Sequence, residues 1–356
     1  MQAALRPLRF APLAAALFCA TITLVAAARP AQAAITAQPF HWSKAAFRDN
    51  GQAVESLTIR AKSGGLETFI RFAMANAGFK DGELTISFRQ ETANGTIYAK
   101  ETFDEDDYTV FADHLGLKAG KHLFEFKNGQ LVGTFDFGTT KASVTMTTSA
   151  GSLALMNRSG PGYVSRALLV PIGRVTVQAQ DATRNATVTA TGFCVHEAST
   201  ATAHQVYDRS VQLHSLVGGN YMIVDYIVMP ASRGGKPFGF VVVSGKGKTF
   251  VGEVVSETRE NEKVDSAIDY QVPYTVSVLA KRGEGRAAVR LTAEKQVSRE
   301  DDLADLNFLA RKAVGALMHP VTYTLKARAD AEVQTLPTEP AVALTANVRF
   351  KYSQVR

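Results

Sequence analysis

The sequence predicts an all-β protein with two antiparallel β-barrel or β-sandwich modules and one late amphipathic helix. Turn dipeptides that tolerate positive φ recur along the chain, and short runs of alternating apolar and polar residues lie between them. A helical period of apolar residues occurs in residues 298–320. Short strands with turns at this spacing are typical of an antiparallel barrel or sandwich. The turn dipeptides are Asn50-Gly51, Gly64-Gly65, Asp81-Gly82, Asn94-Gly95 and Asn128-Gly129.

Residues 1–33 have the pattern of a secretory signal peptide. Two arginines open the segment, an alanine-rich apolar run covers residues 10–28, and Ala31-Gln32-Ala33 is a small-x-small cleavage site. We therefore expect cleavage before Ala34 and a periplasmic or secreted protein that is soluble afterwards. An uncleaved membrane anchor is the alternative, because the apolar run approaches the length that spans a bilayer.

The net charge and the number of cysteines exclude two features, a nucleic-acid partner and an internal disulfide, from what we expect of this protein. Removing the signal takes away Arg6, Arg9 and Arg29 and no acidic residue, so the formal net charge falls from +6 to +3. A balance this mild argues against nucleic acid as a partner. Cys194 is then the remaining cysteine, which excludes an internal disulfide. The fold must rest on its core, and 46% hydrophobic residues is enough for that.

The first module is expected over residues 34–158. Its strand-like runs lie between the turn dipeptides, and several alternate clearly: Leu84, Ile86 and Phe88 face one way. The expected strands are 56–61, 67–74, 83–88, 96–102, 122–126, 131–137 and 142–147.

A break rich in Gly, Pro and Ser over residues 157–165 (NRSGPGYVS) precedes the second module, which is expected over 167–356. The runs 174–180 and 187–195 are expected to pair across the turn DATRNA. Further strands are expected at 221–229, 238–243, 249–257, 270–279, 287–293, 321–327 and 341–352.

The expected helix lies near residues 300–318. Ser298 can cap its N-terminus, Glu300 and Asp301 suit the positive end of the helix dipole, and Pro320 stops it. Such a helix can be a fixed strut that closes an open flank of the sheet, or a lid that opens over a cavity. Its apolar face comprises Leu303, Leu306, Ala310, Ala313, Val314 and Leu317.

Several short motifs resemble one family. Gly192-Phe193-Cys194-Val195-His196 is followed by residues 225–230 (DYIVMP), and the late helix is followed by His319-Pro320-Val321-Thr322-Tyr323. A third segment joins 108–111 (YTVF) to 115–118 (LGLK). Together they resemble the tandem-lipocalin superfamily, which includes fungal survival-factor proteins and, more distantly, carotenoid hydratases and polyene cyclases. The resemblance implies two lipocalin-like modules and a guest of sphingolipid or ceramide type, with a part in the response to oxidative stress.

The chain departs from the hydratase version of the first motif. Val195 stands where that version has an acid before the histidine, and Ala198 stands where it has a tryptophan. By resemblance, the missing carboxylate is the acid that would protonate an alkene. The departure argues against hydratase chemistry at this position.

His196 is the central candidate for ligand contact, with a hydrogen-bonded structural histidine as the alternative. An acid–base pair with Glu197 is disfavoured, because adjacent residues on a strand point to opposite faces. The spacing of His196, His204 and His214 matches no compact ligand motif, so we expect no metal, no cofactor and no assigned catalytic residue. The expected cavity-lining residues are His196, Phe193, Tyr226, Tyr270, Trp42 and Phe72.

These observations favour an exported carrier for a hydrophobic small molecule or long-chain lipid, with transient membrane contact compatible with that role. An isomerase, hydratase or cyclase acting on a polyene or isoprenoid is the alternative, with Asp225, Asp269, Tyr226 and Tyr270 as the acidic or polar groups available. A scaffold of the cell envelope with a filled interior is the third possibility. An acidic residue with a raised pKa, deep in an apolar pocket, would favour the enzyme.

Overall fold

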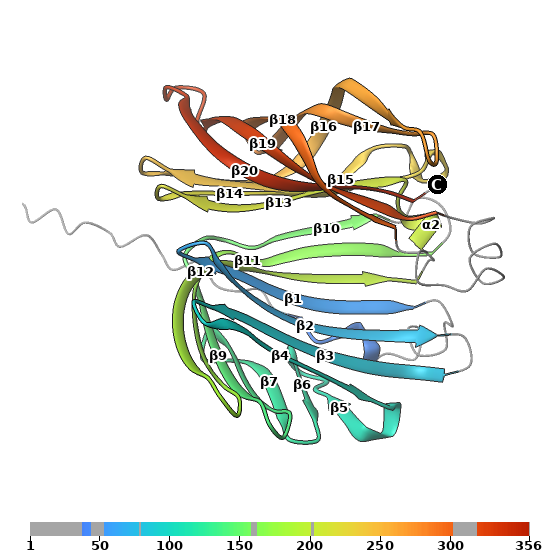
Figure 1. The fold of residues 1–356 in the computed structure, drawn as a ribbon, viewed down its shortest axis with the longest axis vertical. Coiled ribbons are helices and arrows are strands. Elements are labelled where there is room, and N and C mark those ends of the chain that lie inside the picture. Colours follow the sequence, from blue (N-terminus) through green and yellow to red (C-terminus); the bar gives the residue numbers. More distant parts are fainter. Residues whose placement is uncertain are drawn as a thin grey trace, which may run out of the picture. The chain divides into compact units, whose positions relative to one another are not determined.

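The computed structural model describes residues 38–43, 53–77, 80–157, 162–200, 203–301 and 319–355. Nearly all of them are in antiparallel strands, which form two separate sheets (Figure 1). The predicted all-β class with two antiparallel, lipocalin-like modules is therefore confirmed. The short helical elements are η1 (His41–Ser43), η2 (Glu105–Asp107), α2 (Ala203–Val206) and η3 (Ala231–Arg233).

The first sheet has twelve strands, coloured blue to green in Figure 1. Its order is β4-β3-β2-β1-β12-β11-β9-β8-β7-β6-β5, and β10 pairs with β11 outside this path. The strands are β1 (Val54–Ser63), β2 (Leu66–Ala77), β3 (Lys80–Thr92), β4 (Gly95–Phe103), β5 (Tyr108–Val110), β6 (Gly116–Ala119), β7 (His122–Lys127), β8 (Gln130–Asp136), β9 (Lys141–Thr148), β10 (Leu153–Asn157), β11 (Val164–Gln180) and β12 (Asn185–Ser199).

The second sheet is a closed barrel of consecutive strands, in which β13 pairs with β20. Closure leaves no unpaired edge along the barrel. Its strands are β13 (Arg209–Val217), β14 (Asn220–Val228), β15 (Pro237–Gly245), β16 (Lys248–Asp265), β17 (Tyr270–Arg282), β18 (Gly285–Asp301), β19 (Val321–Gln334) and β20 (Val342–Gln354).

Alternation and turn chemistry explain these strands. Leu84, Ile86 and Phe88 on β3 are all fully buried, as one face of a half-buried strand requires. Between β7 and β8, Asn128 and Gly129 have φ of 53° and 75°, the left-handed conformation of a tight hairpin. The sequence marks such a turn with Asn-Gly because those residues tolerate positive φ best.

Each sheet has its own main hydrophobic core. The core of the first sheet gathers Phe40, Trp42, Phe72 and Phe88 with aliphatic residues of β1 to β12. The barrel encloses a second core of small aliphatic side chains with Tyr226, Tyr323, Tyr352 and Phe350 among them. Further buried apolar residues form two smaller clusters, and the site described below belongs to the first core.

The strand pairing differs from the expected division at residues 157–165. β11 pairs with β9 and β12 pairs with β1, so residues 167–199, expected in a module over 167–356, belong to the first sheet. The hairpin across DATRNA is confirmed, with Arg174 opposite Thr191. The sheets divide between Ser199 and Arg209. Turn residues mark where a strand ends and say nothing about its partner, which explains the misplaced boundary.

The start of the expected helix is also corrected. Ser298, Glu300 and Asp301 lie in strand β18, where Asp301 pairs with Val321 of β19. Strand pairing provides backbone partners that outweigh the local capping signal. The rest of that helix, residues 302–318, lies outside the described residues, as do the signal segment 1–33 and its cleavage site before Ala34. Among the described residues, no helix has the length and apolar character needed to cross a membrane.

Candidate ligand site around Glu55 and His196

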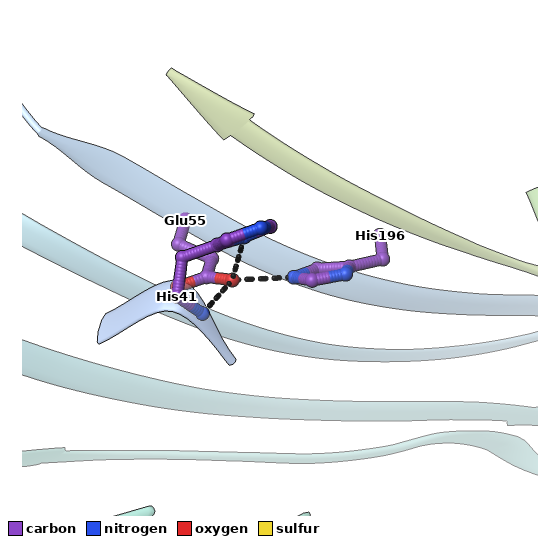
Figure 2. Close-up of side chains that lie close together, drawn as sticks. All are labelled: His41, Glu55 and His196. Atoms are coloured by element: carbon purple, nitrogen blue, oxygen red, sulfur yellow. Dashed lines mark hydrogen bonds and ion pairs between the residues drawn. The ribbon is translucent and has the colours of Figure 1, made fainter. Parts of the chain in front are cut away.

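A fully buried carboxylate lies at the centre of the candidate site. Glu55 Oε1 accepts hydrogen bonds from His196 Nε2 at 2.6 Å and from the His41 backbone N–H at 2.8 Å, and His41 Nδ1 lies 3.2 Å from it. Glu55 Oε2 accepts the Trp42 backbone N–H at 2.8 Å. Figure 2 shows both imidazole rings directed at the one carboxylate. A buried carboxylate requires such a set of donors to offset its lost hydration.

Strand register brings Glu55 and His196 together. β1 and β12 are antiparallel neighbours in which Leu57 lies opposite His196. Glu55 is two residues from Leu57, so its side chain leaves the same face of the sheet and is a diagonal neighbour of His196. His41 comes from η1. Glu55 accepts hydrogen bonds from the first two backbone N–H groups of this turn, those of His41 and Trp42. The carboxylate therefore fixes both this turn and the two rings.

The Glu55 carboxylate is ionised in the folded protein. Burial alone would raise the pKa of Glu55, but the hydrogen bonds from His196 and His41 outweigh it and lower the pKa to about 2. Glu55 is consequently an acceptor and a fixed negative charge near neutral pH. This is the reverse of the raised pKa that alkene protonation requires.

Aromatic contacts restrict the two rings further. The rings of Phe40 and His196 form a T-shaped contact, with 5.4 Å between their centroids. The rings of His41 and His196 lie 5.8 Å apart and are nearly parallel, with 18° between their planes. Together with Glu55, these contacts restrict the orientation of both imidazoles.

A cavity of about 470 Å³ adjoins the two histidines. Its walls come mainly from β10 and β11, and most of them are apolar, while the polar side chains that line it include His41 and His196. Ala167 of β11 lies directly opposite His196 on β12, so the cavity begins beside that ring. The apolar lining includes Leu153, Leu155, Met156, Ala167 and Leu169.

An irregular strand opens this space. The first part of β11 pairs with β10, from Val164 to Leu168, and the later part pairs with β9 from Gly173 onward. Register shifts between Leu168 and Gly173 separate the two parts. Bulges of this kind bend a strand and redirect its side chains. The sheet therefore branches where the cavity lies.

The neighbouring charge on β12 belongs to a different cluster. Glu197 accepts a hydrogen bond from Arg166 Nε at 2.7 Å, and Arg166 Nη2 donates to Asp225 Oδ1 at 2.8 Å. Because His196 bonds Glu55 and Glu197 bonds Arg166, the two adjacent side chains point to opposite faces, as the alternation of a strand predicts. Asp225 is thus an ion-pair partner outside the histidine cavity.

The other predicted cavity residues are distributed over separate cores. Trp42 contributes a backbone donor to Glu55, while Phe72 packs on Phe124 with centroids 4.6 Å apart. Phe193 packs its ring against His214 at 4.9 Å, in another cluster. Tyr226 and Tyr270 lie in the barrel core, where the hydroxyl of Tyr270 donates to the His319 carbonyl at 2.8 Å. Of these five and His196, the structure brings together Trp42 and His196, around Glu55.

Sequence reasoning missed Glu55 and His41. Glu55 is 141 positions from His196 in the chain, so no local spacing connects them. One signal was present: Glu55 is an acid at the start of a run that is otherwise mostly apolar and β-forming, VESLTIR. An acid in such a run requires buried partners, and the pairing of β1 with β12 shows which ones.

Comparisons with known proteins give likenesses of structure only. No family model matches the chain, and no curated protein matches it. The structure is similar to that of a candidate AttH protein from Nitrosomonas europaea, at 12% identity and a TM-score of 0.47, covering 85% of this chain and 93% of that one. It is also similar to CghA with Sch210972, at 9% identity and a TM-score of 0.46, covering 85% and 88%. The likeness to kievitone hydratase from Nectria haematococca has 9% identity and a TM-score of 0.41, and it covers 85% of this chain and 89% of that one.

Likeness of this degree does not identify a shared ligand or activity. The expected relation to survival-factor proteins, with its ceramide-type guest, stays a prediction.

Proposed function

We propose that this protein binds a hydrophobic small molecule with a hydrogen-bonding end, in the cavity beside His196. The observation that carries the proposal is the cavity itself: about 470 Å³, apolar along β10 and β11, and polar at His41 and His196. This volume lies within the roughly 300–1,000 Å³ typical of small-molecule sites, and so does the pattern of apolar walls with few polar groups.

The apolar walls provide the binding free energy. Each CH₂ group removed from water contributes about 0.8 kcal/mol, so a hydrocarbon chain is the guest that gains most from these walls. A long-chain lipid of sphingolipid type, carried by an exported protein in the periplasm, is the specific form of the proposal. It accounts for the apolar lining and for the signal-like start of the chain together.

The histidines provide the orientation. Glu55 occupies Nε2 of His196, and within the described residues the other ring nitrogen of His196 has no hydrogen-bond partner. In the neutral ring that nitrogen is an acceptor, so a hydroxyl group on the ligand would donate a hydrogen bond to it. Because Glu55 and Phe40 fix the ring, this contact costs little additional ordering and selects guests with a polar end.

The same geometry supports binding over an enzyme that protonates an alkene. Glu55 is occupied by donors from His41, Trp42 and His196, so it has no proton to transfer. A cavity of this size also argues against a scaffold with a completely filled interior.

The decisive experiment is native mass spectrometry with lipid extraction, on protein purified from its own envelope. We expect a co-purifying apolar molecule in a 1:1 complex. The variant Ala167→Phe fills the cavity beside His196 and should lose that molecule. Ala186→Phe is the matched control, because Ala186 is also half-buried against the same core and lies outside the cavity. Equal ligand content in both variants would exclude this cavity as the site.

A further inference from the structure

We propose that His41, Glu55 and His196 form a binding site for one divalent transition-metal ion of the Zn²⁺ type. Their potential ligand atoms, one from each residue, all lie within 4.8 Å of one another. It is the one group of three such side chains that the described part of the chain contains. The three residues come from η1, β1 and β12, so the fold gathers them from distant parts of the sequence.

The donor set determines the class of ion. Two imidazole nitrogens and one carboxylate oxygen are ligands that suit Zn²⁺ and its first-row neighbours. Ca²⁺ and Mg²⁺ prefer ligand sets made of oxygen atoms, so they fit this site poorly.

The distances fit after small movements. Tetrahedral ligands at about 2.1 Å from zinc stand about 3.4 Å apart. The carboxylate oxygen is 2.6 Å from His196 Nε2 and 3.2 Å from His41 Nδ1, so these two pairs must open by less than about 1 Å to admit the ion, and the two ring nitrogens, which lie within 4.8 Å of each other, must take the same spacing. Rotation about the side-chain torsions of His41, whose side chain is 20% exposed, adjusts its Nδ1, while the larger movement separates the buried pair of Glu55 and His196.

The protons balance in a simple way. A metal ion requires lone pairs on Nε2 of His196 and on Nδ1 of His41, where hydrogen bonds to Glu55 now lie. Each neutral ring meets this need in the tautomer that carries its proton on the other nitrogen, and a ring that starts protonated releases that proton to solvent. The negative charge of Glu55 then neutralises part of the charge of the ion.

The surroundings are those of a supported site with an open position. Backbone N–H groups of His41 and Trp42 hold the carboxylate, and Phe40 packs on one ring. Such outer contacts orient ligands before the ion arrives. Both histidines line the cavity, so the coordination position left by three protein ligands would face it. The metal site does not depend on the proposed hydrophobic ligand.

A second histidine–glutamate pair provides the matched control. His122 Nε2 lies 2.9 Å from Glu101 Oε2, and His122 is as buried as His196. This pair belongs to no group of three ligands among the described residues. The same substitution, histidine to glutamine, therefore removes a ligand at His196 and none at His122.

The test is titration of tag-free protein, dialysed against a chelator, with Co²⁺ followed by visible absorption and with Zn²⁺ followed by calorimetry. We expect the protein to bind one equivalent of either ion. Bound Co²⁺ should show the d–d absorption bands of an ion in a coordination site of low symmetry. H41Q and H196Q should each weaken Zn²⁺ binding by more than about 100-fold, since they remove a direct ligand, while H122Q leaves it unchanged.

Circular dichroism shows which variants fold, and H41Q carries the test if H196Q does not, because His41 is the more exposed. Wild-type protein without saturable binding, or equal loss in H41Q and H122Q, refutes the site. Binding of a fluorescent fatty acid to the metal-free protein is measured separately. Failure of the metal site and failure of the hydrophobic cavity are therefore distinguishable.

Discussion

The acid at the centre of the candidate site, in the first sheet, and two acids of the barrel keep their charge through different kinds of partner. In the barrel, two half-buried acids are paired with fixed cations: Glu257 bonds Arg209 at 2.8 Å, and Asp265 bonds Arg299 at 2.7 Å. In the first sheet, Glu55 is surrounded by titratable imidazoles and backbone N–H groups, next to a cavity. The barrel arrangement satisfies a charge permanently, whereas histidine partners can exchange their proton for another ligand.

The topology of the two sheets accounts for the position of the cavity. Every barrel strand pairs on both sides, so the interior fills with side chains and a uniform core results. The first sheet is open at β4 and β5 and branches at β11, where β10 leaves the main path. A branch interrupts regular packing, and the cavity lies at that interruption. We therefore expect the closed barrel to contribute mainly stability and the open sheet to hold the ligand.

The largest expected effect is in the barrel core. Phe350 is 1% exposed in that core, so Phe350→Ala should lower the free energy of unfolding by about 3–5 kcal/mol. Chemical denaturation followed by circular dichroism measures the loss. If the sheets divide their tasks as described, the folded variant should keep normal affinity for a fluorescent fatty acid. A change in that affinity would break the comparison.

A smaller effect is expected from the two histidine–glutamate pairs of the first sheet. Glu55→Gln should cost about 1–3 kcal/mol, because it removes the buried charge to which three residues donate. Glu101→Gln should cost less than about 1 kcal/mol, because the Glu101 side chain is 44% exposed and water replaces the lost pair. Denaturant midpoints of the two variants, compared with wild type, decide the point. Equal losses of unfolding free energy in the two variants would show that the different burial of Glu55 and Glu101 does not decide how much each pair stabilises the fold.

Much of the fold follows from local chemistry in the sequence. Asn128-Gly129 predicts its hairpin because few residues adopt positive φ, and the alternation of Leu84, Ile86 and Phe88 predicts which face is buried. The paired strands across DATRNA were predictable for the same reason. The chain break after residue 157 was assigned to the wrong place because a turn does not reveal strand partners.

The site depends on information that is not local. His196 was identified from the sequence, but Glu55 and His41 become its partners only through the pairing of β1 with β12 and through the turn η1. Trp42 was identified as an aromatic and contributes its backbone N–H. Phe72, Tyr226 and Tyr270 are aromatic for reasons of core packing, and residue type alone does not separate those two uses.

A modest dependence on pH is expected from the barrel. Burial would raise the pKa of Asp265, but Arg299 and the hydroxyl of Tyr323 outweigh it and lower that pKa. A depressed folded-state pKa gives stability that is present above the unfolded pKa, near 3.8, and is lost as pH falls through the lower folded value. Asp265→Asn should therefore flatten the fall in melting temperature below about pH 4. If the melting temperature of the variant falls below about pH 4 as steeply as that of wild type, the interactions of Asp265 do not contribute to the acid dependence of stability.

The smallest effect is expected at Cys194, and it separates the open sheet from its cavity. Cys194 lies on β12, two residues from His196, and its side chain is fully buried in the first core. Burial raises the pKa of the thiol, so the reactive thiolate is scarce and shielded. Native protein should react with a disulfide reagent no faster than it unfolds, and denatured protein should react at once. Cys194 and His196 share one face of β12, so adding a fatty acid should leave the native rate unchanged if the cavity beside His196 does not extend along that face to Cys194. A rate that rises in proportion to reagent concentration, while the protein stays folded, would show that the core beside the cavity opens.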